Sequence, residues 1–198
     1  MDRLILGSQS PQRLALCRQL GLDPEVIAPD VDETTMPGEL ASDLVLRLAI
    51  DKAKAVSVTN PDAVVIAGDS VVSVNEKVLG KPADREVARS MLQSLSDTTH
   101  SVFSGLAVVS GDKVFNCVAE TKLSFVKLSP EIIEAYLETN EWEGRAGACC
   151  IQGMGEAFVR SLEGSYSNVV GLPLHKLFEG LTEVGFSGGA FWGATSGE

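Results

Sequence analysis

The chain has 198 residues, which suits one domain or two small lobes. Hydrophobic residues make up 44% and charged residues 22%, so the chain has enough apolar surface to build a core, which excludes a largely disordered protein. The net charge of −11 disfavours binding to nucleic-acid backbones, although a local cluster of Lys and Arg can still hold a small phosphorylated ligand.

Strand-like and helix-like segments alternate along the chain, which predicts the α/β class with a mixed sheet. The apolar run 63–67 is typical of a strand covered on both faces, and Ser110-Gly111-Asp112 is a turn between two long strands. We expect strands at 3–7, 25–28, 63–67, 71–74, 77–79, 101–109, 113–125 and 157–162. We expect helices at 11–20, 42–58 and 84–95, after Ser129-Pro130-Glu131, and at 173–181.

The first candidate site lies between the first strand and the first helix. Ser10 is placed as the N-cap, and the backbone N–H groups at a helix N-terminus bind anions. Ser8 and Arg13 add a hydroxyl and a positive charge that fit a phosphate. An ordinary helix cap explains the same residues, so both interpretations stay open.

Lys52 falls within the apolar stripe of the 42–58 helix at ~100° per residue. Val45, Leu48 and Val56 share its arc, while Asp51 lies on the other side. A lysine in this position either extends its charge to the surface or faces an anion in a cleft. The pattern alone does not decide between them.

Gly68-Asp69-Ser70 is predicted to end the buried strand 63–67. Ligands of open α/β sheets gather beyond the carboxyl ends of strands, so Asp69 is a candidate for chemistry. A turn aspartate that caps local N–H groups is the alternative. Lys81, after the small hairpin, and Glu33, in the acidic loop 29–37, are equally explained as solvated side chains.

Residues 147–155 form a loop that is rich in glycine and low in charge, so it can approach a ligand closely. Gln152 can read the edge of a base through its amide. The dinucleotide-binding fingerprint fails here because its third glycine and its strand–turn–helix context are missing. No P-loop is present.

Cysteine and histidine usage bears on compartment and metal. The four cysteines show no CxxC spacing, and a chain of this size does not need a disulfide framework. The two histidines, His100 and His175, are too few for an ordinary zinc site. No signal peptide is visible, and no run approaches the roughly 18 apolar residues of a membrane span. We therefore expect a cytoplasmic protein with neither nucleic acid nor membrane as partner.

Seven short strings, in this order, resemble the Maf-type nucleoside triphosphate pyrophosphatases, which are related in fold to the inosine triphosphatase (Ham1) group. They are LILGSQSPQR, VDET, LAIDKAKAV, VVIAGDSVV, LGKP, AGACCIQGMG and GSYSNVVGLPL. The resemblance implies a mixed twisted sheet with flanking helices and a central substrate cleft between two lobes. We expect one domain over 1–184 and a Gly/Ser-rich tail over 185–198, in which Phe191 and Trp192 could dock.

The resemblance implies hydrolysis of a nucleoside triphosphate to the monophosphate and pyrophosphate, with a divalent metal (Mg²⁺, Mn²⁺ or Co²⁺) and as a homodimer. It assigns Asp69 as proton acceptor and maps Glu33, Lys52 and Lys81 onto catalytic positions. It also assigns phosphate contacts to residues of the opening motif: Ser8, Ser10 and Arg13.

The chemistry of this residue set agrees with the reaction. Attack of water on the α-phosphorus needs a base, a metal to neutralise the triphosphate, and cations for the charge on pyrophosphate. Glu33 and Asp69 can both hold a metal through oxygen. Lys52, Lys81 and Arg13 can stabilise the developing charge.

Three positions depart from the family pattern and bear on substrate choice. Gln12 replaces the first of two usual arginines, Cys149 replaces a common tyrosine, and Ser70 stands where Thr or Gln is frequent. Ser70 and Gln152 match the dTTP/UTP group, and we assign both, with Gln12, to substrate binding. We expect dTTP and UTP among the best substrates, with CTP and modified pyrimidine nucleotides as further candidates.

Three other functions stay open. The first is 7-methylguanosine triphosphate hydrolysis within the same family. The second is a non-catalytic nucleotide-sensing regulator, because the family name is linked to septum formation and cell-division arrest. An enzyme would instead remove unwanted nucleotides from the cellular pool. The third, a serine esterase built on Gly68-Asp69-Ser70-Val71, is disfavoured because Leu172 stands where its Asp-x-x-His would need an aspartate before His175.

Overall fold

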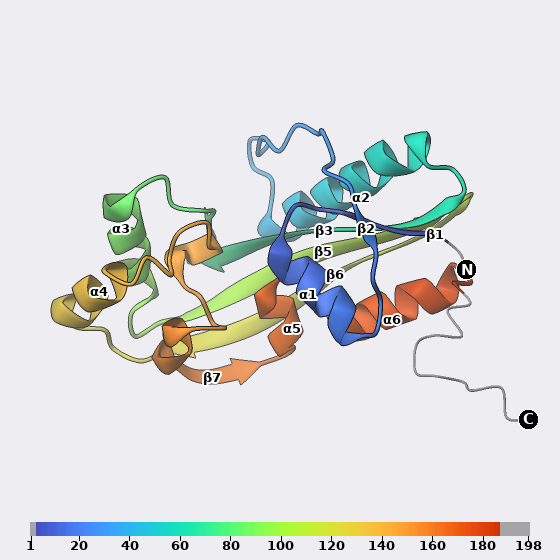
Figure 1. Cartoon of the computed structure of the whole chain (residues 1–198). Helices are drawn as coiled ribbons and strands as arrows, with labels where there is room; N and C mark the ends of the chain where they lie inside the picture. Colours follow the sequence, from blue (N-terminus) through green and yellow to red (C-terminus); the bar gives the residue numbers. More distant parts are fainter. Residues whose placement is uncertain (1–2, 187–198) are drawn as a thin grey trace, which may run out of the picture. The chain divides into compact units, whose positions relative to one another are not determined.

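A computed structural model describes residues 3–186 of the chain (Figure 1). Seven strands form one sheet in the order β2-β1-β3-β5-β6-β7, with β4 paired to β3. Helices flank this sheet, so the predicted α/β class with a mixed sheet is confirmed. Residues 187–198 of the expected tail (185–198), with Phe191 and Trp192, lie outside the described residues, and the expected single domain and central cleft stay predictions.

The strands agree with the sequence pattern apart from a start at Thr99, two residues before the expected start at 101, and three further differences. They are β1 (Arg3–Gly7), β2 (Glu25–Val26), β3 (Ala63–Val74), β4 (Lys77–Leu79), β5 (Thr99–Ser110), β6 (Lys113–Phe125) and β7 (Val159–Glu163). The second strand is shorter than expected, and β7 begins two residues late because Phe158 ends a short 3₁₀ helix. The third difference, in β3, bears on the site and is described below.

The helices begin and end within about two residues of the predicted bounds. They are α1 (Pro11–Gln19), α2 (Ala41–Thr59), α3 (Arg85–Leu95), α4 (Pro130–Leu137), α5 (Tyr166–Val170) and α6 (Leu174–Glu183). Short 3₁₀ helices lie at η1 (Ala146–Ala148) and η2 (Met154–Phe158), and neither these nor α5 was predicted. Ser10, Asp84 and Ser129 accept backbone N–H groups as N-caps, which explains three of the helix starts.

The predicted break after Ala67 is wrong, because β3 continues through Gly68, Asp69 and Ser70 to Val74. Its parallel pairing with β1 ends where β1 ends, at Gly7 opposite Ala67. Beyond that point β3 gains β4 as an antiparallel partner. A Cβ at Gly68 would lie 3.0 Å from the carbonyl oxygen of Gly105, so this glycine serves close packing rather than a turn.

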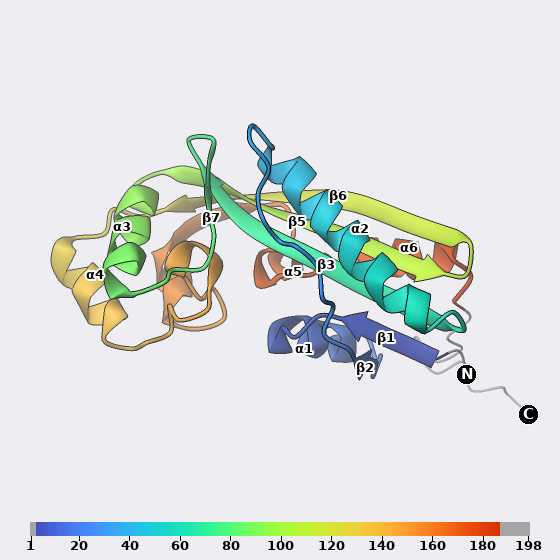
Figure 2. The same cartoon turned by 90° about the horizontal axis from the view of Figure 1, so that it is seen from above.

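The described chain divides into two compact units, and β3, β5 and β6 contribute residues to both. The first unit holds residues up to Asp69, then Ser104–Ala119 and the chain from Gly171 onward. Its helix α2 lies along the sheet (Figure 2) and approaches β5 so closely that a Cβ at Gly105 would lie 2.0 Å from the carbonyl oxygen of Val45. Its core residues come from α2 and three strands: Ile5, Ala49, Ala53, Val56, Val65 and Ala107.

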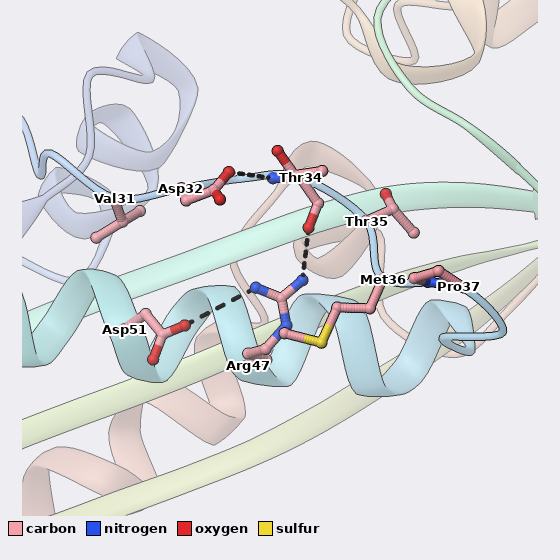
Figure 3. Close-up of a pocket in the computed structure, with 8 residues that line it drawn as sticks. All are labelled: Val31, Asp32, Thr34, Thr35, Met36, Pro37, Arg47 and Asp51. Atoms are coloured by element: carbon pink, nitrogen blue, oxygen red, sulfur yellow. Dashed lines mark hydrogen bonds and ion pairs between the residues drawn. The ribbon is translucent and has the colours of Figure 1, made fainter.

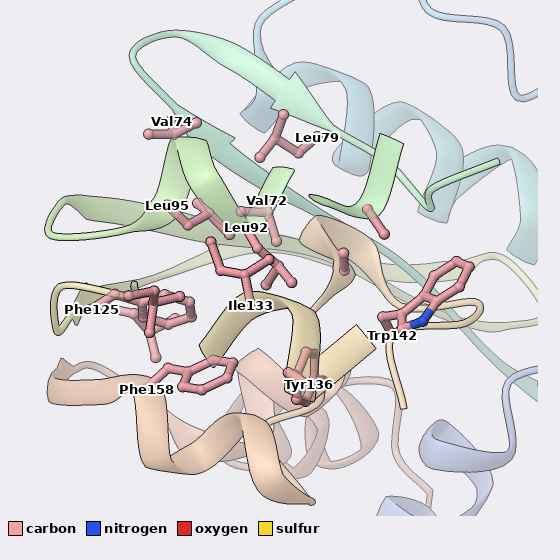
Figure 4. Close-up of a cluster of buried hydrophobic side chains, with 14 of the residues drawn as sticks. Val72, Val74, Leu79, Leu92, Leu95, Phe125, Ile133, Tyr136, Trp142 and Phe158 are labelled. Atoms are coloured by element: carbon pink, nitrogen blue, oxygen red, sulfur yellow. The ribbon is translucent and has the colours of Figure 1, made fainter. Parts of the chain in front are cut away.

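The second unit holds Ser70–Phe103 and Glu120–Val170. Here α3 and α4 pack over a core of aliphatic and aromatic side chains (Figure 4). Burying these side chains contributes roughly 1.5–3 kcal/mol each. The core includes Val72, Leu92, Phe125, Ile133, Tyr136, Trp142 and Phe158. Among residues 3–186, no helix combines the length and apolar character that a bilayer crossing needs.

Candidate active site

One buried lysine joins two carboxylates in the first unit. Lys52 Nζ lies 2.6 Å from Glu33 Oε1 and 2.7 Å from Asp69 Oδ1. The side chain of Lys52 is 7% exposed and that of Asp69 14%, whereas Glu33 is 62% exposed. The sequence left open whether Lys52 extends to the surface. In the structure its side chain is buried and forms an ion pair with each of the two carboxylates.

Regular elements position the inner two of these residues. Lys52 lies near the middle of α2, the helix held on β5 at the Gly105 contact. Asp69 lies in β3 two residues beyond the last β1 pair, where the neighbouring strand has ended and room opens beside the carboxylate. Asp69 therefore still sits past the carboxyl end of a parallel strand, namely β1, as the ligand-binding rule for α/β sheets requires.

Glu33 comes from a loop that α2 holds in place through Arg47 (Figure 3). The Arg47 guanidinium donates to both carboxylate oxygens of Glu39, at 2.6 and 2.8 Å, and to the carbonyl oxygen of Thr34 at 3.1 Å. This bidentate bond holds the pKa of Glu39 down at about 2. An open cavity of about 560 Å³ lies here, lined by Arg47 and Asp51 of α2 and by the loop residues Val31, Asp32, Thr34, Thr35, Met36 and Pro37.

The opening motif gathers around Arg13. Its Nη1 donates to the hydroxyl of buried Ser8 at 3.1 Å, and its Nε donates to the carbonyl oxygen of Gly171 at 2.9 Å. Burial lowers the pKa of Arg13, while the carboxylates of Asp69 and Glu33 oppose that shift. The guanidinium therefore lies within the electrostatic reach of both acids and beside Gly68, where a Cβ would be 3.7 Å from Nε.

Ser10 and Gln12 complete the N-terminus of α1. Ser10 Oγ accepts from the backbone N–H of Arg13 at 3.4 Å, as predicted for the N-cap. The same hydroxyl donates to Oε1 of Gln12 at 3.1 Å. Gln12 thus lies at the helix end beside Ser10 and Arg13, where it places an uncharged amide.

The remaining predicted residues, Ser70, Lys81 and Gln152, belong to the second unit. Ser70 is half-buried in β3, while Lys81 and Gln152 are exposed. A backbone hydrogen bond from Gly147 N to Gly80 O, at 3.1 Å, joins the glycine-rich loop to the segment that carries Lys81. Gly147 takes a φ of +66°, and a Cβ there would lie 3.0 Å from Val72 Cγ2, so both conformation and space favour glycine.

The family of the chain follows from its whole sequence. The family model described as Maf-like protein matches residues 3–184. The chain belongs to the Maf family. The family predicted from the motifs is therefore confirmed, and it spans both units.

Curated relatives match this Maf chain along nearly all of its length. A dTTP/UTP pyrophosphatase from Symbiobacterium thermophilum is 47% identical and covers 96% of the chain and 100% of the relative. A dTTP/UTP pyrophosphatase from Sphingopyxis alaskensis is 47% identical and covers 93% and 98%. A solved HAM1 protein from Coxiella burnetii is 21% identical, with a TM-score of 0.46 over 65% of this chain and 75% of that one.

Two carboxylates of this Maf chain, those of Glu33 and Asp69, are candidate ligands for a divalent cation. Glu33 and Asp69 each place an oxygen within hydrogen-bonding distance of the same Lys52 nitrogen, so the two oxygens converge. Among residues 3–186, no group of three or more His, Cys, Asp or Glu side chains is placed to hold a metal ion. Two carboxylates suit Mg²⁺, which takes one or two from the protein and completes its ligands with water and substrate phosphates.

Sequence reasoning missed the residues that hold this set in place. Arg47 read as part of the polar face of α2, and its partner Glu39 lies outside every motif. Gly171, whose carbonyl holds Arg13, is distant in sequence. No periodicity signals such contacts, because they depend on where a loop meets a helix.

Proposed function

We propose that this protein hydrolyses nucleoside triphosphates to the monophosphate and pyrophosphate, with dTTP and UTP among its best substrates. The observation that carries this proposal is the pair of acids joined by buried Lys52, with Arg13 and Ser8 beside them in the same unit. The relatives named dTTP/UTP pyrophosphatase support the reaction and the substrate class.

In the proposed reaction, Asp69 accepts the proton of the attacking water. Its Oδ1 is engaged by Lys52, which leaves the other carboxylate oxygen for the water. A bond forms between the water oxygen and the α-phosphorus, the bond from that phosphorus to the bridging oxygen breaks, and pyrophosphate leaves with the electron pair. The hydrogen bond from Lys52 holds the Asp69 carboxylate in position until the proton moves.

Cationic and polar groups receive the phosphates. Arg13 and the hydroxyls of Ser8 and Ser10 supply donors at the N-terminus of α1, where anions also meet unsatisfied backbone N–H groups. Glu33 and Asp69 are the residues that would hold a divalent cation (Mg²⁺, Mn²⁺ or Co²⁺), whose chemistry there is to neutralise the triphosphate. Lys81 adds charge for the leaving pyrophosphate, and Gln12, Ser70 and Gln152 contact the nucleotide.

Two further expectations belong to this proposal. A homodimer is expected from the family alone, and sedimentation at micromolar concentration would test it. A cytoplasmic site of action is supported by the four cysteines, Cys17, Cys117, Cys149 and Cys150, which are all free thiols as in a reducing compartment.

Replacing Asp69 with Asn tests the reaction directly. The amide keeps the shape of the side chain and removes its capacity to accept a proton, so we expect kcat for UTP to fall by more than about a hundredfold. Pyrophosphate release measures kcat, and binding of a non-hydrolysable UTP analogue, measured by calorimetry, should change far less. A variant that keeps more than about a tenth of wild-type kcat, a loss under ~1.4 kcal/mol in barrier, would show that Asp69 is not the base.

A further inference from the structure

The loop that carries Gln152 is held by a side chain on each side of that residue. The hydroxyl oxygen of Tyr136 accepts from the backbone N–H of Cys150 at 2.9 Å. Glu141 Oε2 accepts from the backbone N–H of Met154 at 2.8 Å. Both bonds reach backbone atoms two residues from Gln152, one before it and one after it.

Gly153 lets the Glu141 carboxylate come close to the loop. A Cβ at this position would lie 2.4 Å from Glu141 Oε2 and 2.6 Å from Oε1, so the carboxylate fills the space of a side chain. The φ of Gly153 is −126°, outside the left-handed region, so glycine is needed here for space alone. The loop also closes on itself, because Gly153 N donates to the carbonyl oxygen of Cys150 at 3.1 Å.

The two holding residues are themselves firmly placed. Tyr136 is a buried residue of α4. Its ring packs edge to face against that of Phe158, with 5.0 Å between the ring centroids (Figure 4). Glu141 follows α4, and its backbone N–H donates to Thr139 Oγ1 at 3.2 Å. The next residue, Trp142, is buried and donates from its indole to the carbonyl oxygen of Leu137 at 3.0 Å.

The loop thus presents an exposed amide on a backbone that is fixed from within. Gln152 is exposed, whereas Cys150 and Gly155 on either side of it are buried. A hydrogen-bonding group discriminates between bases only when its own position is fixed, because a mobile amide adapts to any partner. We infer that Glu141 and Tyr136 are positioning residues that fix Gln152 for recognition of the nucleotide base, an inference that rests on the proposed function.

The test compares a substrate with a base and one without. The ratio of kcat/KM for UTP to kcat/KM for ribose 5′-triphosphate reports base recognition and cancels losses in phosphate handling. We expect Glu141→Ala to lower this ratio about tenfold, and Tyr136→Phe to lower it in the same direction. Glu141→Gln keeps an oxygen acceptor for Met154 N, so its ratio should stay within about twofold of wild type.

The matched control is Glu143→Ala, which removes the same charge from an exposed residue of the same segment. Its ratio should equal that of wild type. The inference is supported if the ratio is lowered in Glu141→Ala and close to wild type in Glu141→Gln. A general loss of stability would not depend on whether the substituted side chain keeps an oxygen acceptor. Melting temperatures of all variants accompany the kinetics.

The kinetics distinguish failure of this inference from failure of the proposed function. If wild type prefers UTP over the base-free substrate and Glu141→Ala keeps that preference, the inference is overturned and the proposed function stands. If Glu141→Ala and Glu141→Gln lower the ratio equally, the acceptor is not what matters, and the inference is again overturned. If wild type releases no pyrophosphate from UTP, the proposed function itself fails.

Discussion

At Lys52, one ammonium takes part in two ion pairs, and the two partners differ in their surroundings. Asp69 is largely enclosed beside Lys52, with Arg13 nearby, whereas Glu33 is mostly solvated. Removing the partner of an enclosed charge costs more than removing both partners together. This asymmetry makes the structural and catalytic roles of Lys52 separable.

We expect Lys52→Met to lose activity and about 1–3 kcal/mol of unfolding free energy, because Asp69 then lacks its nearest cation. The double variant Lys52→Met/Asp69→Asn should regain much of that stability while staying inactive. Urea unfolding of wild type, both single variants and the double variant gives the coupling energy. Additive effects of the two substitutions would contradict a direct Lys52–Asp69 interaction.

His100 makes the stability of the second unit depend on pH. It is buried against the ring of Phe125, its Nδ1 has no hydrogen-bond partner, and burial lowers its pKa from 6.5 to about 4. The unfolded chain therefore binds a proton on His100 between pH 6.5 and 4 that the folded chain does not. Stability from the neutral ring is present above pH 6.5 and is lost as pH falls through this window.

Between pH 7 and pH 5 we expect wild type to lose about 2 kcal/mol more unfolding free energy than His100→Phe. Phenylalanine keeps an aromatic ring at the site and cannot take up a proton. Carboxylates titrate equally in both proteins, so the difference between them isolates His100. Parallel stability curves over this range would show that the folded protein protonates His100 normally.

The element that sets the position of Glu33 is the loop 31–39 on α2. Its attachment depends on the Arg47 bonds to Glu39 and to the carbonyl oxygen of Thr34. Glu39 in turn accepts from the backbone N–H of Met36 at 3.0 Å, so one carboxylate organises both the loop and its anchor. The loop holds no helix or strand, so its position on α2 depends on this cluster and on the ion pair of Glu33 with Lys52.

We expect Arg47→Ala to lower kcat roughly threefold to tenfold, with less effect on melting temperature, because Glu33 then moves away from Lys52 for part of the time. Arg18→Ala is the control. It removes the same charge from α1, where Arg18 forms an exposed ion pair with Asp23. Steady-state kinetics and thermal unfolding of both variants check the expectation. Equal kcat in Arg47→Ala and Arg18→Ala would show that the loop keeps Glu33 in place without the hydrogen bonds from Arg47.

At the scale of the whole molecule, the residues assigned to the nucleotide are distributed over both units. Glu33, Lys52, Asp69 and the opening motif belong to the first, and Ser70, Lys81 and Gln152 to the second. Each unit has its own apolar core, so each can hold its share of these side chains in place. The chain carries a net charge of −11, so binding of a triphosphate would depend on a local cluster of cationic side chains.

A screen of triphosphates tests the substrate assignment. We expect dTTP and UTP to be cleaved best, and Gln12→Arg to sharpen that preference, since an arginine adds a charge-assisted contact worth about 1.5–3 kcal/mol. Pyrophosphate release from each canonical nucleotide and from 7-methylguanosine triphosphate measures the ranking. Cleavage of 7-methylguanosine triphosphate ten times faster than UTP would overturn the pyrimidine assignment and leave the pyrophosphatase reaction intact.

The sequence by itself determined the class, the family and most elements. Alternating apolar runs, N-caps such as Ser10 and Ser129, and turn residues are local signals, and local physics is enough to interpret them. The apolar stripe of α2 also placed Lys52 among its apolar residues, but it left open whether the charge reaches the surface. These features depend on residues within a few positions of one another.

Only the tertiary structure decided how those residues are used. The strand was expected to end at Gly68, yet β3 continues through this residue, which packs against the Gly105 carbonyl oxygen, a contact that no local pattern reveals. Three other contacts join segments that no local pattern brings together. They are the ion pair of Lys52 with Asp69, the bond of Arg47 to Glu39, and the contact of the Glu141 carboxylate with Gly153. A hydrogen bond or close contact depends on distances of a few tenths of an ångström, and those are set by packing rather than by periodicity.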